Sequence, residues 1–298
     1  MNPLTCAQAL LATRSAGLER LDAHLLLLHA LGKPAGDRAW LLAHDTDELA
    51  QSVAGAFGLL VKRRASGEPL AYIVGSKAFF GLELQVDARV LVPRPDTETL
   101  VQWSLDILLA PAMSADPQIL DLGTGSGAIA LAIAHTLRAA NRSARVLAVD
   151  ASAGALDVAG ANARSLGLRV EFVKSCWLQE VTGSFHLIVS NPPYIASGDP
   201  HLAALVHEPL QALVAGADGL ADIRRIIEEA PAHLLPGGWL LLEHGYDQAG
   251  RVRELLAQHG FEDIQSRRDL AGIERCSGGQ WRQWPPIPAG HGATGGQR

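Results

Sequence analysis

Residues 118–259 alternate between short apolar runs and longer amphipathic segments, and this alternation constrains the fold more than any other feature of the chain. The apolar runs predict strands at 118–122, 145–149, 170–173, 185–189 and 239–242. The amphipathic segments predict helices at 127–139, 155–166, 222–235 and 248–259. Strands that alternate with helices form a parallel sheet covered on both faces. We therefore expect an α/β domain with a ligand crevice at the carboxyl ends of its strands.

The segments outside this region follow other patterns. Leu21, Leu25 and Leu28 recur at helical spacing, which predicts a helix close to the N-terminus. A second helix is expected over the apolar residues from 49 to 61, with Thr46 as its N-cap. These helices predict a small bundle ahead of the α/β domain.

After the bundle the apolar period changes to two, which predicts a β-hairpin with strands at 80–86 and 88–92. A helix is expected at 97–109, and strands at 261–268 and 281–284 are expected to close the sheet. The predicted organisation is a helical bundle at 1–75, a β-hairpin linker at 76–95, the α/β domain at 96–284 and a disordered tail rich in Pro and Gly at 285–298.

The composition excludes several classes of protein. A formal net charge of −6 argues against a protein that binds nucleic-acid phosphates, so no direct DNA binding is expected. The three cysteines are widely spaced and odd in number, which favours a reducing, cytoplasmic location over a disulfide framework. The eleven histidines are scattered, so no metal is expected. No apolar run is long enough to span a membrane.

The strand at 118–122 runs into a helix through the glycine-rich turn Gly123-Thr124-Gly125-Ser126-Gly127. Glycines let the backbone approach a ligand closely and leave helix N–H groups free to bind it. No Gly-Lys-Ser/Thr follows, so this is not a phosphate-binding Walker loop. The turn also fits a dinucleotide motif, with Asp150 placed to bind ribose hydroxyls. Asp121 favours S-adenosylmethionine instead, because a carboxylate repels pyrophosphate but binds a ligand that carries an ammonium group.

Asn191-Pro192-Pro193-Tyr194 follows the strand at 185–189. It resembles the signature of methyltransferases that act on a planar NH2 nitrogen: adenine N6, cytosine N4 or a glutamine amide. Such a nitrogen is a poor nucleophile because its lone pair is delocalised. The Asn191 side-chain oxygen and the Pro192 carbonyl can accept hydrogen bonds from its two N–H groups and aim the lone pair. The two prolines stiffen the segment, and Tyr194 offers a stacking face.

Further segments extend the resemblance over nearly all of residues 4–275. They are residues 67–75, 79–81, 90–98, 208–209, 216–220 and 269–272. Together they resemble the HemK/PrmC family, the protein-(glutamine-N5) methyltransferases that modify the Gly-Gly-Gln loop of peptide-chain release factors. The resemblance implies a Rossmann-like methyltransferase domain, S-adenosylmethionine as cofactor, and a release factor as protein substrate in translation termination. It also implies that the helical bundle recognises this substrate.

The resemblance implies two sets of site residues. Cofactor contacts are expected from the turn at 123–127, Asp150, Trp177 and Asn191, and the substrate glutamine is expected to be held by residues 191–194. The position of Trp177 beyond the third strand suits packing on an adenine ring. Arg94 and Glu98 could brace the site from the linker, but a solvated or structural ion pair is the expected account of these two residues. The sequence departs from the family at Asp96, often Glu, and at His244, usually apolar.

Three other functions stay open from the sequence. A ribosomal-protein glutamine methyltransferase shares the turn and the Asn-Pro-Pro-Tyr segment. A DNA adenine-N6 methyltransferase needs a basic face and a pocket for a flipped base, which the acidic balance disfavours. A cofactor-binding regulator without catalysis is the third. Gly-Gly-Gln also occurs in the chain itself, at 278–280 and 295–297, so self-methylation of Gln297 is a hypothesis, although chance explains these tripeptides better.

Overall fold

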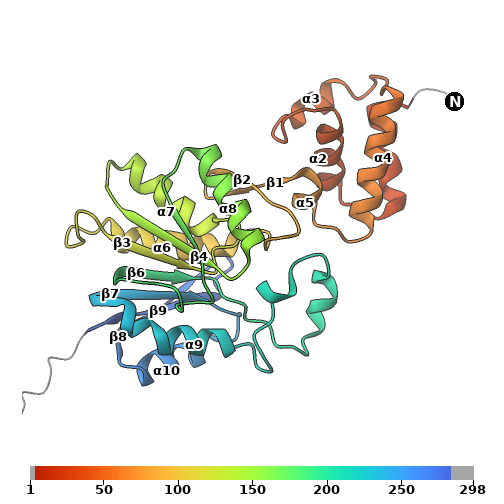
Figure 1. The fold of residues 1–298 in the computed structure, drawn as a ribbon. Coiled ribbons are helices and arrows are strands. Elements are labelled where there is room, and N and C mark those ends of the chain that lie inside the picture. Colours follow the sequence, from red (N-terminus) through yellow and green to blue (C-terminus); the bar gives the residue numbers. More distant parts are fainter. Residues whose placement is uncertain (1–3, 283–298) are drawn as a thin grey trace, which may run out of the picture.

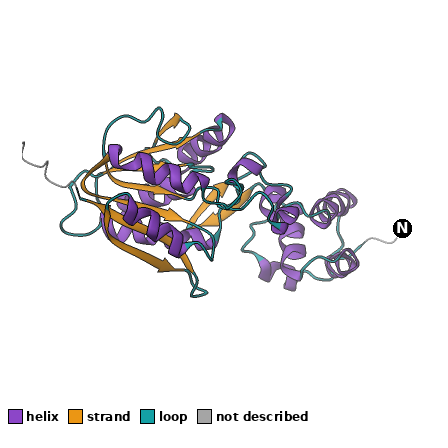
Figure 2. Ribbon diagram, turned by 90° about the horizontal axis from the view of Figure 1, so that it is seen from below, coloured by secondary structure: helices purple, strands orange, loops and turns teal. Residues whose placement is uncertain are grey.

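The computed structural model describes residues 4–282, which form two lobes joined by a β-hairpin (Figure 1). The N-terminal lobe is helical, whereas the larger lobe holds a sheet between helices (Figure 2). The predicted fold class, a Rossmann-like α/β domain preceded by a helical bundle and a hairpin, is confirmed. Within residues 4–282, no helix combines the length and the apolar character needed to cross a bilayer.

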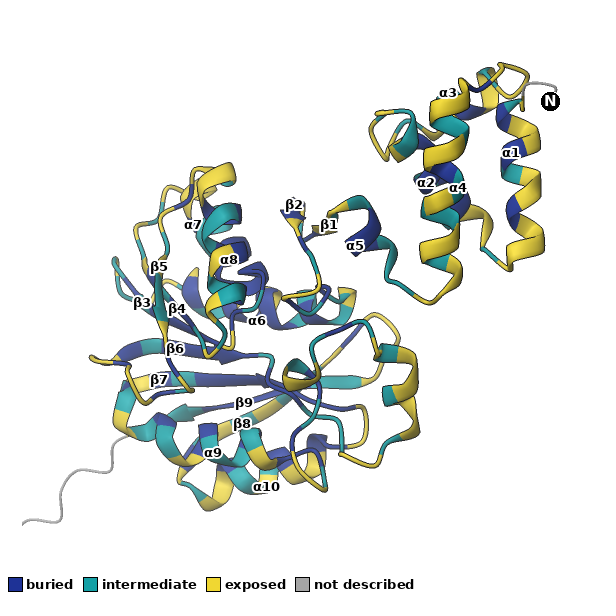
Figure 3. Ribbon diagram, turned by 45° about the vertical axis from the view of Figure 1, so that its right-hand side comes forward, coloured by how far each residue is buried: buried dark blue, intermediate teal, exposed yellow. Residues whose placement is uncertain are grey.

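The described part of the N-terminal lobe packs short helices around a small apolar core. They are α1 (Cys6–Ala12), a 3-10 turn at Thr13–Ala16, α2 (Arg20–Ala30), α3 (Arg38–Ala43), α4 (Gln51–Ala65) and α5 (Leu70–Val74). Leu26, Leu27 and Phe57 lie in this core, and the outward faces of the helices are exposed (Figure 3). The helical spacing seen in the sequence thus corresponds to buried faces.

The predicted N-cap at Thr46 is wrong. The carbonyl groups of Asp45 and Asp47 accept hydrogen bonds from the first backbone N–H groups of α1, at 2.8 and 3.0 Å. These N–H groups have no partner inside their own helix, and the turn at residues 44–46 together with Asp47 satisfies them instead of starting a helix. For this reason α4 begins only at Gln51.

The hairpin between the lobes occurs earlier than the sequence predicts. β1 (Ser76–Phe79) and β2 (Leu82–Gln85) pair antiparallel around the turn Phe80-Gly81. Both turn residues have a positive φ, 47° and 76°, as a type I′ turn requires. Phenylalanine rarely adopts this conformation, so the sequence does not reveal the turn. The predicted strand at 88–92 is wrong, because this segment is a loop that buries Val90 and Val92.

The larger lobe is built on a seven-stranded sheet in the order β5-β4-β3-β6-β7-β9-β8. The strands are β3 (Gln118–Leu122), β4 (Arg145–Asp150), β5 (Glu171–Lys174), β6 (Phe185–Ser190), β7 (Leu234–Glu243), β8 (Phe261–Arg268) and β9 (Glu274–Trp281). β3 to β7 pair in parallel, and β9 pairs antiparallel with both β7 and β8. The strand order reverses between β3 and β6, so the carboxyl ends of these two strands border the expected ligand crevice.

Helices cover both faces of the sheet (Figure 1). On one face lie α6 (Glu98–Leu108), α7 (Ala128–Ala139) and α8 (Ala153–Leu166), and on the other α9 (Ala221–Glu229) and α10 (Ala249–Gln258). Short 3-10 turns occur at Pro95–Thr97, Pro200–Leu205 and Leu210–Ala212. Ile119 packs into the core beside α7, and its neighbour Leu120 packs into the core beside α9 and α10. Burial on both faces explains the continuous apolar runs.

Two predicted boundaries in the C-terminal region are wrong. The helix predicted at 222–235 ends at Glu229, because Pro231 has no N–H group to continue it, and a 3-10 turn at Ala230–His233 leads into β7. Of the strand predicted at 281–284, Trp281 is the last residue of β9 and Arg282 lies outside any strand, while residues 283–284 fall outside the described part of the chain.

The internal Gly-Gly-Gln at 278–280 belongs to this strand. A Cβ on Gly278 would lie 2.5 Å from the carbonyl oxygen of Leu240, so glycine is required there by the close approach of β7. Gln297, the subject of the self-methylation hypothesis, and the predicted tail at 285–298 lie outside the described residues.

Candidate active site

A cavity of about 520 Å³ opens at the carboxyl ends of the central strands, next to the point where the strand order reverses. Its volume falls in the range typical of small-molecule sites. The predicted site residues that line it are Gly123, Thr124, Gly125, Ser126, Asp150, Trp177, Asn191 and Pro193. The predicted residues that do not line it are Asp121, Gly127, Pro192 and Tyr194. The fold therefore brings two segments from different strands, the glycine turn and the Asn-Pro-Pro-Tyr segment, to one hollow.

The glycine turn has a backbone shape that only small residues allow. Gly123 has a φ of 69° and Gly127 a φ of 84°, both in the left-handed region. A Cβ on Gly123 would lie 3.2 Å from the Trp177 ring, and one on Gly127 would lie 2.9 Å from Leu131. The Thr124 N–H donates to the Val149 carbonyl at 2.9 Å, which ties the turn to β4. The turn is thus fixed in shape by the surrounding chain.

Asp150, the last residue of β4, holds the turn from the side of the cavity. Its Oδ2 accepts a hydrogen bond from Gly125 N at 2.9 Å, and its Oδ1 accepts one from Ser152 N at 2.8 Å. Burial raises the pKa of Asp150, while these backbone hydrogen bonds favour the carboxylate. Since each carboxylate oxygen can accept more than one hydrogen bond, Asp150 keeps capacity for ligand hydroxyl groups.

Asp121 lies beneath the turn and is fully buried. Its Oδ2 accepts hydrogen bonds from Thr124 Oγ1 at 2.6 Å and from Ala130 N at 3.2 Å, and its Oδ1 has no partner among the described residues. Burial raises the pKa of Asp121 to about 7. These contacts fasten the turn to the start of α7, so within the described structure Asp121 supports the cavity from below.

Trp177 lines the cavity beside the glycine turn. Its φ of 54° is strained for a residue other than glycine, and its indole Nε1 donates to Asp222 Oδ1 at 3.0 Å. This hydrogen bond directs the ring against Gly123. Asp222, at the start of α9, also lines the cavity, and sequence reasoning did not identify it. An acidic residue in the first turn of a helix is common, so its functional contact was not visible in the sequence.

The Asn191 side chain is held at one end only. Its Nδ2 donates to Thr97 Oγ1 at 3.1 Å. Its Oδ1 is buried and has no hydrogen-bond partner among residues 4–282. A buried acceptor without a partner is costly, and such atoms concentrate where a ligand supplies the missing donor. Asn191 therefore presents an acceptor that is prepared for a donor from outside the chain.

The rest of the segment is fixed by its neighbours. Pro192 and Pro193 are buried, and no described residue donates a hydrogen bond to the Pro192 carbonyl. Gln248 Nε2 donates to the Tyr194 carbonyl at 3.0 Å. A Cβ on Gly219 would lie 2.3 Å from that same carbonyl oxygen, so the chain needs glycine there. Gln248 and Gly219 shape the segment from distant positions.

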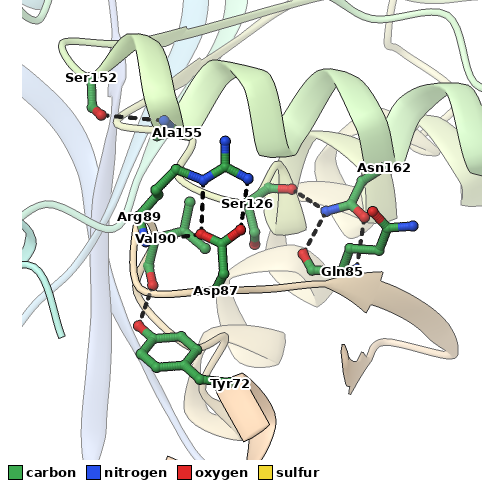
Figure 4. Close-up of polar contacts among 9 residues, drawn as sticks. All are labelled: Tyr72, Gln85, Asp87, Arg89, Val90, Ser126, Ser152, Ala155 and Asn162. Atoms are coloured by element: carbon green, nitrogen blue, oxygen red, sulfur yellow. Dashed lines mark hydrogen bonds and ion pairs between the residues drawn. The ribbon is translucent and has the colours of Figure 1, made fainter. Parts of the chain in front are cut away.

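The linker is clamped to the glycine turn by Asn162 on α8, a residue that sequence reasoning missed (Figure 4). Asn162 Nδ2 donates to the carbonyl groups of Gln85 and Ser126 at 3.0 and 2.9 Å, and its Oδ1 accepts from Gln85 N at 2.7 Å. Figure 4 also shows Arg89, which lines the cavity, paired with Asp87 at 2.6 Å. The sequence could have indicated the role of Asn162, because this polar residue falls on the buried face of the helix predicted at 155–166.

The expected ion pair between Arg94 and Glu98 is wrong. Arg94, which lines the cavity, pairs instead with the buried Glu208 at 2.5 Å, and Glu208 also accepts from Val92 N at 3.1 Å. Glu98 Oε1 accepts a hydrogen bond from Phe80 N at 2.9 Å, which anchors the hairpin turn to α6. Each of these two contacts holds together segments that are distant in the sequence: residue 94 with residue 208, and residue 80 with residue 98.

The two departures from the family pattern have structural roles. Asp96 pairs with Arg275 at 3.3 Å. His244 is buried, and its Nε2 lies 2.8 Å from Ser277 Oγ in β9. No group of His, Cys, Asp and Glu residues in the described part of the chain has the arrangement of a metal site.

A mostly parallel sheet covered on both faces, with a glycine turn and a polar Asn-Pro-Pro-Tyr segment at the point where its strand order reverses, defines the class of Rossmann-like methyltransferases. A solved structure agrees on the fold. The T. thermophilus 16S rRNA N2 G1207 methyltransferase, in complex with AdoMet and guanosine, superposes with a TM-score of 0.51 at 21% identity, covering 70% of this chain and 50% of that one.

Sequence comparison identifies the family within this class. Residues 4–75 match the family described as "PrmC N-terminal domain". Residues 105–259 match the family described as "Methyltransferase small domain". The release factor glutamine methyltransferase of Bordetella pertussis is 49% identical over 88% of this chain and 95% of its own length. That of Burkholderia pseudomallei is 47% identical over 94% and 97%. The chain belongs to the release factor glutamine methyltransferase family, which confirms the predicted HemK/PrmC membership.

Proposed function

We propose that the chain transfers a methyl group from S-adenosylmethionine to the side-chain amide N5 of the glutamine in the Gly-Gly-Gln motif of peptide-chain release factors. The observation that carries this proposal is the buried Asn191 Oδ1, which has no donor within residues 4–282 and lies in a residue that lines the cavity. An amide NH2 group is the kind of donor that fits it, because it brings two N–H groups to a site of acceptors.

The cavity fits the cofactor. Asp150 offers carboxylate acceptors for ribose hydroxyls, and the Trp177 ring beside Gly123 offers an apolar face for a purine. The glycine turn at 123–127 would pass close to the bound molecule because it carries no bulky side chains. When bound, S-adenosylmethionine would supply a methyl group already activated by a sulfonium centre. We propose Asp121 as the residue that fastens the turn rather than as a direct contact.

The substrate amide would be held by the Asn-Pro-Pro-Tyr segment. Asn191 Oδ1 and the Pro192 carbonyl would accept hydrogen bonds from the two N–H groups of the glutamine nitrogen. These hydrogen bonds would favour a pyramidal nitrogen and direct its lone pair toward the methyl carbon. Tyr194 would pack against the planar amide group, and Pro193 would border the space between substrate and cofactor.

The N-terminal lobe, proposed as a recognition domain at 1–75, would select the protein substrate. The residues that line the cavity begin at Arg89, so no described residue of this lobe lines it, which leaves the lobe free to contact the protein substrate. With a release factor as substrate, we propose a cytoplasmic location and a role in translation termination.

Methyl transfer to a purified release factor tests the proposal. The chain should label the release factor, and should not label a variant in which the glutamine of its Gly-Gly-Gln motif is replaced by asparagine. Label on a ribosomal protein or on duplex DNA, with none on the release factor, would contradict the proposal in favour of the corresponding alternative.

A further inference from the structure

Gln248 joins the Asn-Pro-Pro-Tyr segment to two other loops. Gln248 is the N-cap residue of α10, and it is buried. Its Oε1 accepts a hydrogen bond from Gly245 N at 2.8 Å, and its Nε2 donates to the carbonyl groups of Tyr194 and Gly219 at 3.0 and 3.5 Å. Gly245 follows β7 and Gly219 precedes α9, so one amide group connects three separate segments of the chain.

The partners of Gln248 allow its amide only one orientation. Gly245 offers an N–H group, which needs an acceptor, whereas Tyr194 and Gly219 offer carbonyl oxygens, which need donors. A reversed amide would place its oxygen against two carbonyl oxygens. The loops also pack closely, since a Cβ on Gly219 would lie 2.9 Å from Gln248 Nε2, and one on Gly245 would lie 3.1 Å from Gln248 Oε1. Hydrogen bonding and packing therefore both fix this side chain.

The Tyr194 carbonyl belongs to the peptide unit that ends the Asn-Pro-Pro-Tyr segment. The N–H group of the same unit, that of Ile195, donates to the Leu213 carbonyl at 2.9 Å. The carbonyl group of this unit is bound by Gln248 at 3.0 Å. The end of the segment is thus held from both sides.

The start of the segment is anchored in the sheet. Ser190 pairs with β3 and β7, and its Oγ donates to the Leu122 carbonyl at 2.7 Å. Between these anchors, the proline rings of residues 192 and 193 fix two of the backbone φ angles, so the segment has few ways to absorb a displacement. A shift of the Tyr194 carbonyl is therefore passed on to the Pro192 carbonyl, two residues earlier.

We propose that Gln248 is a positioning residue for methyl transfer, because it holds the end of the segment so that the Pro192 carbonyl lies where the substrate amide needs its second acceptor. The inference rests on the proposed function, in which Asn191 Oδ1 and the Pro192 carbonyl bind the glutamine nitrogen. Neither Gln248 nor Tyr194 lines the cavity, so Gln248 acts through the backbone and not by contact with the reacting atoms.

Nuclear magnetic resonance of tyrosine labelled with carbon-13 at the carbonyl tests the hydrogen bond without substrate or cofactor. The chain has three tyrosines, and the signal of residue 194 is the one lost in Tyr194→Phe. Gln248→Met, which keeps the length of the side chain but has no N–H group, should shift this signal. Gln258→Met, an exposed change in the same helix, should leave it in place. An unshifted signal in Gln248→Met would overturn the inference.

Kinetics with Gln248→Glu give a readout that a purely structural role would not change. As a carboxylate, the glutamate turns an oxygen toward the Tyr194 carbonyl, so at about pH 9 kcat should be roughly 10- to 100-fold below the wild-type value. Burial against two carbonyl oxygens raises the pKa of such a carboxyl group, and its protonated form can donate to the Tyr194 carbonyl. The ratio of the variant kcat to the wild-type kcat should therefore rise at least about fivefold as the pH is lowered to about 6. A ratio that does not change with pH contradicts the positioning role.

Titratable groups already present around Gln248 occur in both proteins, so comparison with the wild type at each pH separates their effect from that of the new carboxyl group. They are Asp218 with its partners Arg224 and Arg251, Glu243, which contacts Tyr194, and the neighbours of Gly245, namely His244, Tyr246 and Asp247. Gln258→Glu is the matched control and should keep the wild-type kcat at every pH.

The two proposals fail in different ways. A wild-type chain that does not label release factor, but whose Tyr194 signal shifts in Gln248→Met, contradicts the proposed function and leaves the contact supported. A wild-type chain that labels release factor, with full kcat in both Gln248→Met and Gln248→Glu, contradicts the positioning role alone. Cofactor affinity should stay within about twofold in both variants. Thermal melting shows which variants fold, and if Gln248→Glu does not fold, Gln248→Met carries the test through the carbonyl signal and kcat.

Discussion

The two segments that border the cavity are built on opposite principles. In the glycine turn, Thr124 and Gly125 donate to β4, and Thr124 also binds Asp121, so the turn holds its shape through its own hydrogen bonds. In the Asn-Pro-Pro-Tyr segment, the prolines have no N–H group and Asn191 Oδ1 has no partner among residues 4–282. Hydrogen bonds within the chain therefore fix the turn itself, although Asp121 Oδ1 beneath it has no partner among residues 4–282, whereas Asn191 Oδ1 in the second segment borders the cavity and needs a donor from another molecule.

This difference indicates that the glycine turn serves cofactor binding and that the Asn-Pro-Pro-Tyr segment serves the reaction with the substrate. A rigid turn with satisfied hydrogen bonds suits a cofactor, which must fit the same surface in every cycle. An unsatisfied acceptor suits the reacting group, because its hydrogen bond strengthens as charge develops on the nitrogen. Changes in the turn should therefore alter cofactor affinity or stability, and changes in the segment should alter the rate.

The largest effect is expected from Asn191→Ala. Loss of the acceptor should lower kcat by about 100- to 1,000-fold, the usual cost of removing one preorganised group that stabilises the transition state. The affinity for S-adenosylmethionine, measured by calorimetry, should change by less than about fivefold, since alanine leaves the glycine turn intact. A variant that binds cofactor normally and keeps more than a tenth of the wild-type kcat would contradict the claim that the Asn-Pro-Pro-Tyr segment controls the rate.

The second effect is a pH dependence of stability caused by Asp121. Its pKa is raised from 3.8 to about 7 in the folded chain, so between these values the folded state binds more protons than the unfolded state. Stability from this group is present below about pH 4 and is lost as the pH rises to about 7. The free energy of unfolding of the wild type should therefore fall over this window by roughly 2 to 4 kcal/mol relative to Asp121→Asn. Parallel curves for the two proteins in denaturant titrations would show that Asp121 does not titrate there.

A smaller effect is expected from Asp150→Ala on cofactor binding. Removal of a carboxylate that orders the turn and faces the cavity should weaken the affinity for S-adenosylmethionine about 10- to 100-fold. At saturating cofactor, kcat should stay close to the wild-type value, because Asn191 is untouched. A fall in kcat that persists at saturation would show that the turn takes part in the chemistry.

The smallest effect is expected from Trp177→Phe. Phenylalanine keeps an aromatic face beside Gly123 but loses the indole N–H that binds Asp222, so cofactor affinity should fall only about three- to tenfold. Trp40→Phe in the N-terminal lobe is the matched control and should leave cofactor affinity unchanged, since Trp40 packs on His44 away from the cavity. An equal loss in both variants would point to a general loss of stability.

The sequence predicts the sheet well because the central strands β3 and β6 and the C-terminal half of β7 are buried on both faces and are mainly apolar. The glycine turn and the Asn-Pro-Pro-Tyr segment are visible because their residue types are unusual at strand ends. The hairpin was misplaced because Phe80 adopts a conformation that its residue type disfavours.

The supporting contacts could not be predicted from local patterns. Asn191 and Thr97 are 94 residues apart, and Asn162 and Gln85 are 77 apart. Glu243 is the final residue of β7, and neither its own position nor its neighbours in sequence indicate Tyr194 as the hydrogen-bond partner of its carboxyl group. Only the folded sheet brings such residues together, so the positioning of Asn191 became apparent in three dimensions alone.

A crystal structure of the chain with S-adenosylhomocysteine and a Gly-Gly-Gln peptide would test the central claim most directly. The substrate glutamine nitrogen should lie within about 2.7–3.2 Å of Asn191 Oδ1. Asn191 Nδ2 should stay bound to Thr97. A substrate glutamine whose carbonyl oxygen faces Asn191, or whose amide lies away from the Asn-Pro-Pro-Tyr segment, would contradict it.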